Sequence, residues 1–158
     1  MAAPKSPAFD PFDVAETNAT RYPEPFAALV TKRWNRRLGD HAGLTNFGVV
    51  LTRIEPGGQS SVRHSHLKQD EFVYVLEGEA VMVTDAGRQM MPAGTCAGFP
   101  AGSTDAHHFF NESDADMLLL VVGDRTPGEV ATYPDDDLAG RMLDDGRYVF
   151  THKDGSPY

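Results

Sequence analysis

Two histidines and a glutamate stand close together near the middle of the chain. His64 and His66 are two residues apart in a strand-like segment, so alternation along a strand places both side chains on the same face. Glu71 follows four residues later, after a turn that could bring its carboxylate back against the two imidazoles. Imidazole and carboxylate ligands suit Fe, Mn, Zn, Ni or Cu, whereas a structural zinc site normally uses thiolates, and the chain has only Cys96. These residues predict an open site for one divalent metal ion.

The glycines around these residues extend the pattern. Gly58 is followed by five residues and then His64-Ser-His66; after four more residues comes Glu71, and after six more Gly78. This spacing resembles the first signature of the cupin superfamily at every specified position. The resemblance implies an antiparallel β-barrel of the jelly-roll type, also called a double-stranded β-helix, that carries a metal on its inner side.

A second segment resembles the second cupin signature, with one departure. Gly94 is followed by five residues and Pro100-Ala-Gly102, then by His107 and, after three more residues, Asn111. Cupins usually place two residues between that glycine and the histidine, whereas this chain has four. The resemblance implies His107 as the fourth metal ligand because its distance to Asn111 is the usual one. The adjacent His108 is the alternative, and the two side chains point to opposite faces of a strand.

The whole-chain pattern resembles a group of small, single-domain bacterial cupins that are called cupin-domain proteins or candidate sugar-phosphate isomerases. The resemblance implies a metal-dependent enzyme acting on a small polar molecule, with isomerase-type or dioxygenase-type chemistry on a sugar or carboxylic acid. A non-catalytic ligand-binding or sensor cupin with a structural metal is the alternative. No catalytic residue is assigned and no organic cofactor is expected, because fold alone does not fix a reaction.

The elements that must position these residues are short strands. Segments rich in Val, Phe, Leu and Thr alternate with glycine- and proline-containing turns, which predicts a sandwich or barrel. The expected strands are 44–55, 61–66, 71–77, 80–84, 95–99, 107–111 and 117–122. We expect an N-terminal arm and helix over 1–43, the β-barrel over 44–124 and a C-terminal extension over 125–158 that packs on the barrel.

Two helices are expected in the flanks. Apolar residues between Pro25 and Leu38 recur at approximate helical spacing, with Lys32, Arg33, Arg36 and Arg37 on a mostly solvated face. We interpret this segment as a surface helix that covers a barrel end; the alternative is an anion site. A second short helix is expected over 138–143, followed by a strand-like segment at 147–151.

Other arginines are candidate contacts for an anionic substrate. Arg53, Arg63 and Arg88 could serve if they point inward, but alternation puts Arg63 on the face opposite His64 and His66. The chain therefore supplies few obvious cations beside the metal ligands, which weakens the sugar-phosphate interpretation.

Charge and composition restrict the partners. A formal net charge of −9 repels nucleic acid and anionic lipid surfaces, so neither nucleic acid nor membrane is an expected partner. The longest apolar run, 117–122, is too short to span a bilayer, and no leader-like segment is seen, so we expect a soluble, cytoplasmic protein. Exposed sheet edges and the proline-containing arm favour a homodimer that binds a small molecule.

Overall fold

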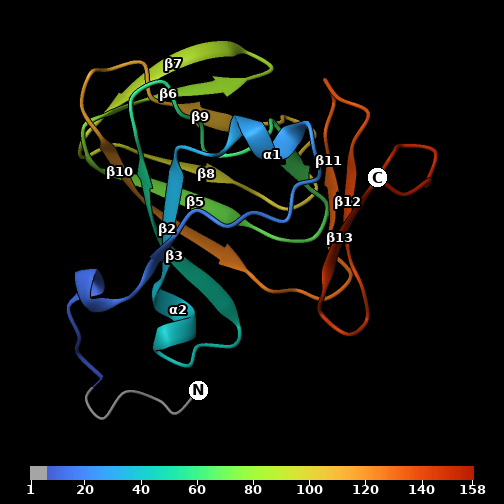
Figure 1. Ribbon diagram of the computed structural model, residues 1–158, viewed down its shortest axis with the longest axis horizontal. Coiled ribbons are helices and arrows are strands. Elements are labelled where there is room, and N and C mark those ends of the chain that lie inside the picture. Colours follow the sequence, from blue (N-terminus) through green and yellow to red (C-terminus); the bar gives the residue numbers. More distant parts are fainter. Residues whose placement is uncertain (1–6) are drawn as a thin grey trace.

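Short antiparallel strands make up most of the structure, a computed structural model that describes residues 7–158. The predicted N-terminal arm starts at residue 1, so its first six residues lie outside the described part. The helices are single turns: α1 (Phe26–Leu29), α2 (Leu38–His41) and the 3-10 turn η1 (Pro11–Asp13). This arrangement confirms the prediction of an antiparallel all-β fold with short flanking helices (Figure 1).

The largest sheet has six strands and carries the glutamate of the site. Its order is β1-β2-β3-β10-β5-β8, and every pair within it is antiparallel. The strands are β1 (Glu16–Thr17), β2 (Arg33–Arg37), β3 (Phe47–Ile54), β10 (Met117–Asp124), β5 (Glu71–Glu77) and β8 (Cys96–Phe99). Glu71, Val73 and Val75 alternate with outward residues, so β5 turns all three side chains to the inner face.

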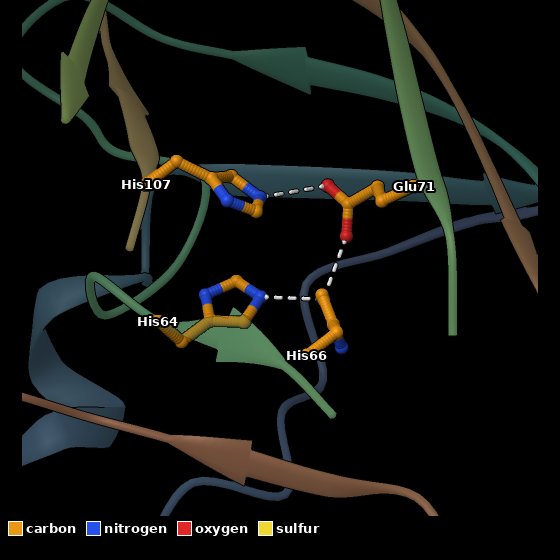
Figure 2. Close-up of side chains that lie close together, drawn as sticks. All are labelled: His64, His66, Glu71 and His107. Carbon is orange, nitrogen blue, oxygen red and sulfur yellow. Dashed lines mark hydrogen bonds and ion pairs between the residues drawn. The ribbon is translucent and has the colours of Figure 1, made fainter. Parts of the chain in front are cut away.

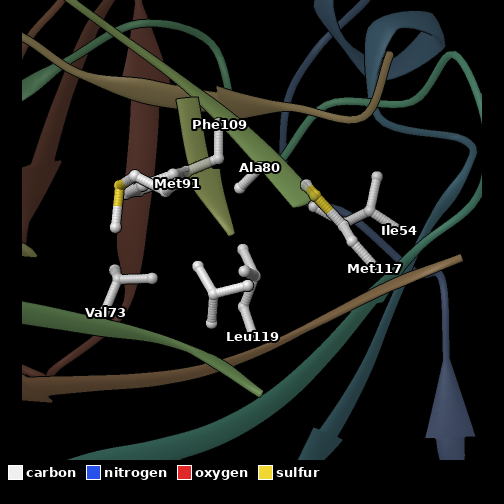
Figure 3. Packing of buried hydrophobic residues seen from close by; sticks show 8 residues of the cluster. Ile54, Val73, Ala80, Met91, Phe109, Met117 and Leu119 are labelled. Atoms are coloured by element: carbon white, nitrogen blue, oxygen red, sulfur yellow. The ribbon is translucent and has the colours of Figure 1, made fainter. Parts of the chain in front are cut away.

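A three-stranded sheet packs against the inner face of this large sheet. It consists of β7 (Gly87–Pro92), β6 (Glu79–Thr84) and β9 (His108–Phe110). The main hydrophobic core lies between the two sheets, as Figure 3 shows, and its side chains come from both: Ile54, Val73, Val75, Ala80, Met91, Phe109, Met117 and Leu119. The facing of two antiparallel sheets is the jelly-roll arrangement expected from the sequence.

The third sheet has four strands and carries His66, while His64 lies just before it and bridges to His107. Its order is β13 (Tyr148–Thr151), β12 (Ala139–Met142), β11 (Val130–Thr132) and β4 (Ser65–His66). A second apolar cluster, of Phe26, Val62, Ala131, Tyr133 and Leu138, packs α1 against this sheet. The chain after residue 125 therefore packs on the strand that bears His66.

The expected helix over residues 25–38 is wrong in its larger part. Only Phe26–Leu29 is α-helical, and Arg33–Arg37 forms β2, which pairs with β3 along its whole length. Pairing with β2 supplies hydrogen-bond partners for backbone groups of β3, which a helix would leave unsatisfied. The stabilisation from these hydrogen bonds outweighs the weak helical preference of the segment.

The expected helix over 138–143 is also wrong, because Ala139–Met142 forms β12 between β11 and β13. Gly140 lies in its middle, where a Cβ would come within 2.7 Å of the Tyr148 ring. The strand-like segment at 147–151 is confirmed as β13. Strand β7, which follows the turn at Asp85-Ala86, is not among the strands expected from the sequence. Within residues 7–158 no helix is long and apolar enough to cross a membrane.

Candidate metal centre

Four side chains from separate parts of the chain converge on one point inside the fold. The ligand atoms of His64, His66, Glu71 and His107 all lie within 4.8 Å of one another (Figure 2). The Nε2 atoms of His64 and His66 are 3.0 Å apart, and the two oxygens of Glu71 lie 2.9 Å from His66 Nε2 and 3.3 Å from His107 Nε2. The structure thus brings together all four residues that the sequence singled out.

The backbone decides which of the two adjacent histidines joins the cluster. His64 and His107 form an antiparallel bridge, with N–H to O distances of 3.1 and 2.8 Å in the two directions. Residues that face each other in such a pair turn their side chains to the same side. His107 therefore points at the cluster, whereas His108 points away and its Nδ1 lies 3.2 Å from the carbonyl oxygen of Ser61.

Each imidazole is oriented by a different neighbour. His64 Nδ1 donates to the Val62 carbonyl at 2.8 Å, and His66 Nδ1 lies 3.3 Å from the carboxylate of Glu129. These contacts favour a proton on Nδ1 and leave the Nε2 lone pairs facing the cluster. The ring of His107 stacks on Phe99, with 3.5 Å between the centroids and 9° between the planes.

Glu129 is the functional residue that sequence reasoning missed. Its side chain is buried, and besides His66 it accepts hydrogen bonds from the backbone N–H groups of Leu67 and Lys68 at 2.9 and 2.8 Å. The carboxylate thus fixes both the ring of His66 and the turn that leads to Glu71. Because 63 positions separate Glu129 from His66, no spacing rule could have linked them.

Burial and charge set the protonation of the cluster. Burial lowers the pKa of His64 to about 3, so this ring is neutral near pH 7. Burial alone would lower the pKa of His66. The hydrogen bond and negative charge of Glu71, and to a smaller extent those of Glu129, outweigh burial and raise that pKa. Burial alone would raise the pKa of Glu71, but the hydrogen bonds of His107 and His66 hold it far below its usual range. Glu71 is therefore a carboxylate.

The donor set fits a divalent metal ion. The Nε2 atoms of His64 and His66 lie 3.0 Å apart and a carboxylate lies beside them, an arrangement that a shared cation would satisfy. Three imidazoles and one carboxylate suit first-row divalent ions, and with four protein ligands an octahedral ion keeps open positions. The cluster is compatible with a metal site.

A cavity of about 200 Å³ opens beside the cluster. His64 and Glu71 line it, and Val73, Leu119 and Val121 add apolar side chains from the large sheet. Polar side chains of β2 also line the cavity. The volume is that of a small molecule, so a ligand in the cavity would touch the cluster directly.

Comparisons with known proteins agree on a single family. The family model of the cupin domain matches residues 50–123. The structure of a sugar phosphate isomerase of the cupin superfamily from Silicibacter pomeroyi superposes with a TM-score of 0.91, with 46% identity over 96% of each chain. A candidate sugar phosphate isomerase from Acidithiobacillus ferrooxidans gives a TM-score of 0.71, with 29% identity over 80% of each chain.

A more distant likeness extends to the fold alone. The polyketide cyclase RemF from Streptomyces resistomycificus superposes with a TM-score of 0.62 at 23% identity, over 74% of this chain and 78% of that one. No curated protein matches the chain.

Proposed function

The chain belongs to the cupin superfamily, and from this premise we propose that it is a metal-dependent enzyme acting on a small polar molecule by isomerase-type chemistry. One divalent ion is held by His64, His66, Glu71 and His107. The observation that carries the proposal is the convergence of these four ligand atoms within 4.8 Å beside a cavity of small-molecule size.

Isomerisation is favoured over dioxygenation by the relatives. The 46% identical protein from Silicibacter pomeroyi is named a sugar phosphate isomerase. A hydroxy-carbonyl compound such as a sugar is a substrate on which a bound divalent ion supplies Lewis acidity, polarising the carbonyl or hydroxyl oxygen. The reacting end of the molecule would lie beside His64 and Glu71, which line the cavity together with apolar side chains of the large sheet.

Metal analysis of three proteins tests the ligand set. The wild-type chain should contain about one divalent ion, His107→Ala should lose most of it, and His108→Ala should keep it, because His108 points away from the cluster. His108→Ala is the matched control, since it removes the same ring from the neighbouring position. A metal-free wild-type protein, or an empty site in His108→Ala and not in His107→Ala, would contradict the ligand assignment.

Activity is tested on the metal-loaded protein. Interconversion of aldose and ketose phosphates, followed by proton NMR in D₂O, should show exchange of the proton next to the carbonyl, and this exchange should vanish in His107→Ala. Oxygen uptake with the iron-loaded protein, without any proton exchange, would overturn isomerase-type chemistry in favour of the dioxygenase branch.

A further inference from the structure

Strand β2 turns a row of basic and amide side chains into the cavity. Arg33, Asn35 and Arg37 all line it, together with His64 and Glu71 of the cluster. The basic segment that resembled a surface helix is a strand, and the period of two brings every second residue to the inner face.

The pairing register supports the inward direction. Asn35 lies opposite Thr52 and Arg37 lies opposite Val50 on β3, and both of these partners also line the cavity. Thr52 Oγ1 donates to Asn35 Oδ1 at 2.9 Å, which leaves the two N–H donors of the Asn35 amide for another acceptor. The row therefore presents donors and positive charge toward one space.

In the described part of the chain, no carboxylate forms an ion pair with Arg33 or Arg37. Within residues 7–158 six other arginines form ion pairs with acidic side chains: Arg36, Arg53, Arg63, Arg88, Arg125 and Arg147. Arg33 and Arg37 form none, although the chain carries a net charge of −9. The acidic residue lining the cavity is Glu71, which is engaged with His66 and His107. Two uncompensated cations in a partly enclosed space favour an anion there.

Arg33 lies deeper than Arg37 and has an unused donor. Its Nη1 donates to the Ser60 carbonyl at 2.8 Å, while its Nε is buried with no hydrogen-bond partner in the described part of the chain. Burial lowers the pKa of Arg33, and the like charge of Arg37 acts in the same direction. An anion beside the guanidinium would offset both costs, because planar guanidinium groups bind phosphate and carboxylate oxygens well.

We propose that Arg33 and Arg37, with the amide of Asn35, form an anion-binding subsite that selects substrates carrying a phosphate or carboxylate group. This inference rests on the proposed function. The subsite would bind the charged end of the same substrate whose other, polar end reaches His64 and Glu71. Arg33 is the inner contact, and the exposed Arg37 lies toward solvent, where its charge attracts the anion.

Three probes of the same carbon skeleton test the subsite by calorimetric titration. They are glycerol 3-phosphate, glycerate and neutral glycerol, and each is titrated into the metal-loaded and the metal-free full-length chain. At least one of the two anions should bind at least about tenfold more tightly than glycerol in both forms. The anion that binds more tightly shows whether the subsite prefers phosphate or carboxylate. Equal binding of glycerol and both anions, or no binding of any probe, would overturn the subsite.

Substitutions assign the effect to the strand. Arg33→Gln should weaken the preferred anion at least about tenfold, and Arg37→Gln at least about threefold, with glycerol unchanged. Arg33→Lys should recover part of the affinity because it keeps the charge. Arg141→Gln is the control: it removes the same charge from an exposed position of β12. Wild-type anion affinity in Arg33→Gln would overturn the proposal.

Metal content, measured on every sample, separates the two proposals. The arginine variants should keep their metal, because neither residue belongs to the cluster. Anion binding that depends on Arg33 in a protein that never holds metal would defeat the proposed function and leave the subsite standing. Anion binding that is lost in His107→Ala but unchanged in Arg33→Gln would mean that the anion sits on the metal, which would defeat the subsite and leave the proposed function standing.

Discussion

At the residue scale, the orientation of each imidazole depends on a neighbour of a different kind. A backbone carbonyl holds His64, a buried carboxylate holds His66, and an aromatic ring holds His107. A ring that cannot turn keeps its Nε2 lone pair in place before any ion arrives, which lowers the entropic cost of binding. The three contacts contribute separately, so each can be removed without replacing a ligand.

Glu129→Gln should weaken metal binding about 10- to 100-fold, because the neutral amide polarises His66 less and holds its ring less firmly. The amide keeps the size of the side chain and can still accept one of the backbone hydrogen bonds from Leu67 and Lys68. Titration with zinc against a competing chelator measures the effect. Glu112→Gln, at an exposed carboxylate paired with Arg88, is the control and should bind as wild type; a matching loss there would contradict the role given to Glu129.

The residues that sequence could predict are those joined by short spacing. His64, His66 and Glu71 fall within eight positions, and the spacing to Asn111 favoured His107. Glu129 reaches the site only because β11 pairs with β4, and Arg33 reaches it only because β2 pairs with β3. Contacts made by strand pairing over tens of residues leave no periodic trace in one sequence.

At the element scale, β1 shows how the N-terminal arm is fastened. Its two residues pair with β2, and the carboxylate of Glu16 receives two hydrogen bonds from Arg53, both of 3.0 Å. Arg53, weighed from the sequence as a substrate contact, is therefore engaged on the outer face, where it also pairs with Asp116. The arm thus adds an edge strand to its own sheet, and a bidentate ion pair holds this strand in place.

Glu16→Gln should lower the free energy of unfolding by about 0.5–1 kcal/mol at pH 7. The hydrogen bond from Arg53 lowers the pKa of Glu16 below its ordinary 4.5. A carboxylate with a depressed folded-state pKa stabilises the fold above its unfolded pKa, and this stabilisation disappears as the pH falls through the folded value. The difference between variant and wild type should therefore shrink below about pH 4.5 in urea unfolding. Glu24→Gln, at an exposed carboxylate outside the ion pairs of residues 7–158, should show no such pH dependence.

Gly78 forms the tight turn between β5 and β6 with a φ of +74°, and a Cβ there would lie 2.9 Å from the Asp116 carbonyl oxygen. Gly43 has the same φ, but nothing lies within 4 Å of its Cβ position. Gly43→Ala should cost about 1–2 kcal/mol from the backbone conformation alone, and Gly78→Ala at least about 1 kcal/mol more from the clash. Denaturant unfolding of both variants measures the difference; equal losses would show that the turn relaxes freely.

At the scale of the whole molecule, apolar side chains remain on the outer face of the large sheet. Phe72 is 43% exposed and Leu76 40% exposed on β5, next to the edge strand β8, which has one neighbour in the described sheet. Edge strands and outward apolar side chains are features that proteins usually cover. The homodimer expected from the sequence stays a prediction, and this face is where we expect it to form.

Sedimentation should give a species of about twice the 17.2 kDa of one chain. Phe72→Glu should shift this species toward the monomer, because it would place a charge in the covered face. Leu29→Glu, at a similarly exposed side chain on α1, should not. A wild-type protein that sediments as a 17.2 kDa species at high concentration would rule the dimer out.

The overall architecture was within reach of the sequence because the strands are short, apolar and separated by turn residues. The failures lie where propensity and pairing disagree. Residues 33–37 are basic and 139–142 include a glycine, yet both segments are strands. Each forms backbone hydrogen bonds with a neighbouring strand, β2 with β3 and β12 with β13. β7 was missed because its residues are mostly exposed, so it lacks the apolar alternation that marks a strand.

The strand that bears His66 belongs to the C-terminal sheet rather than to the large one. β4 pairs with β11, which is followed by β12 and β13, and Glu129, the carboxylate that contacts His66, directly precedes β11. Proteins open in units such as this sheet, each with its own opening rate. We therefore expect the release of an ion held by His66 to depend on local opening of this sheet as well as on affinity. Mild denaturant should speed ion exchange well before the rest of the molecule unfolds.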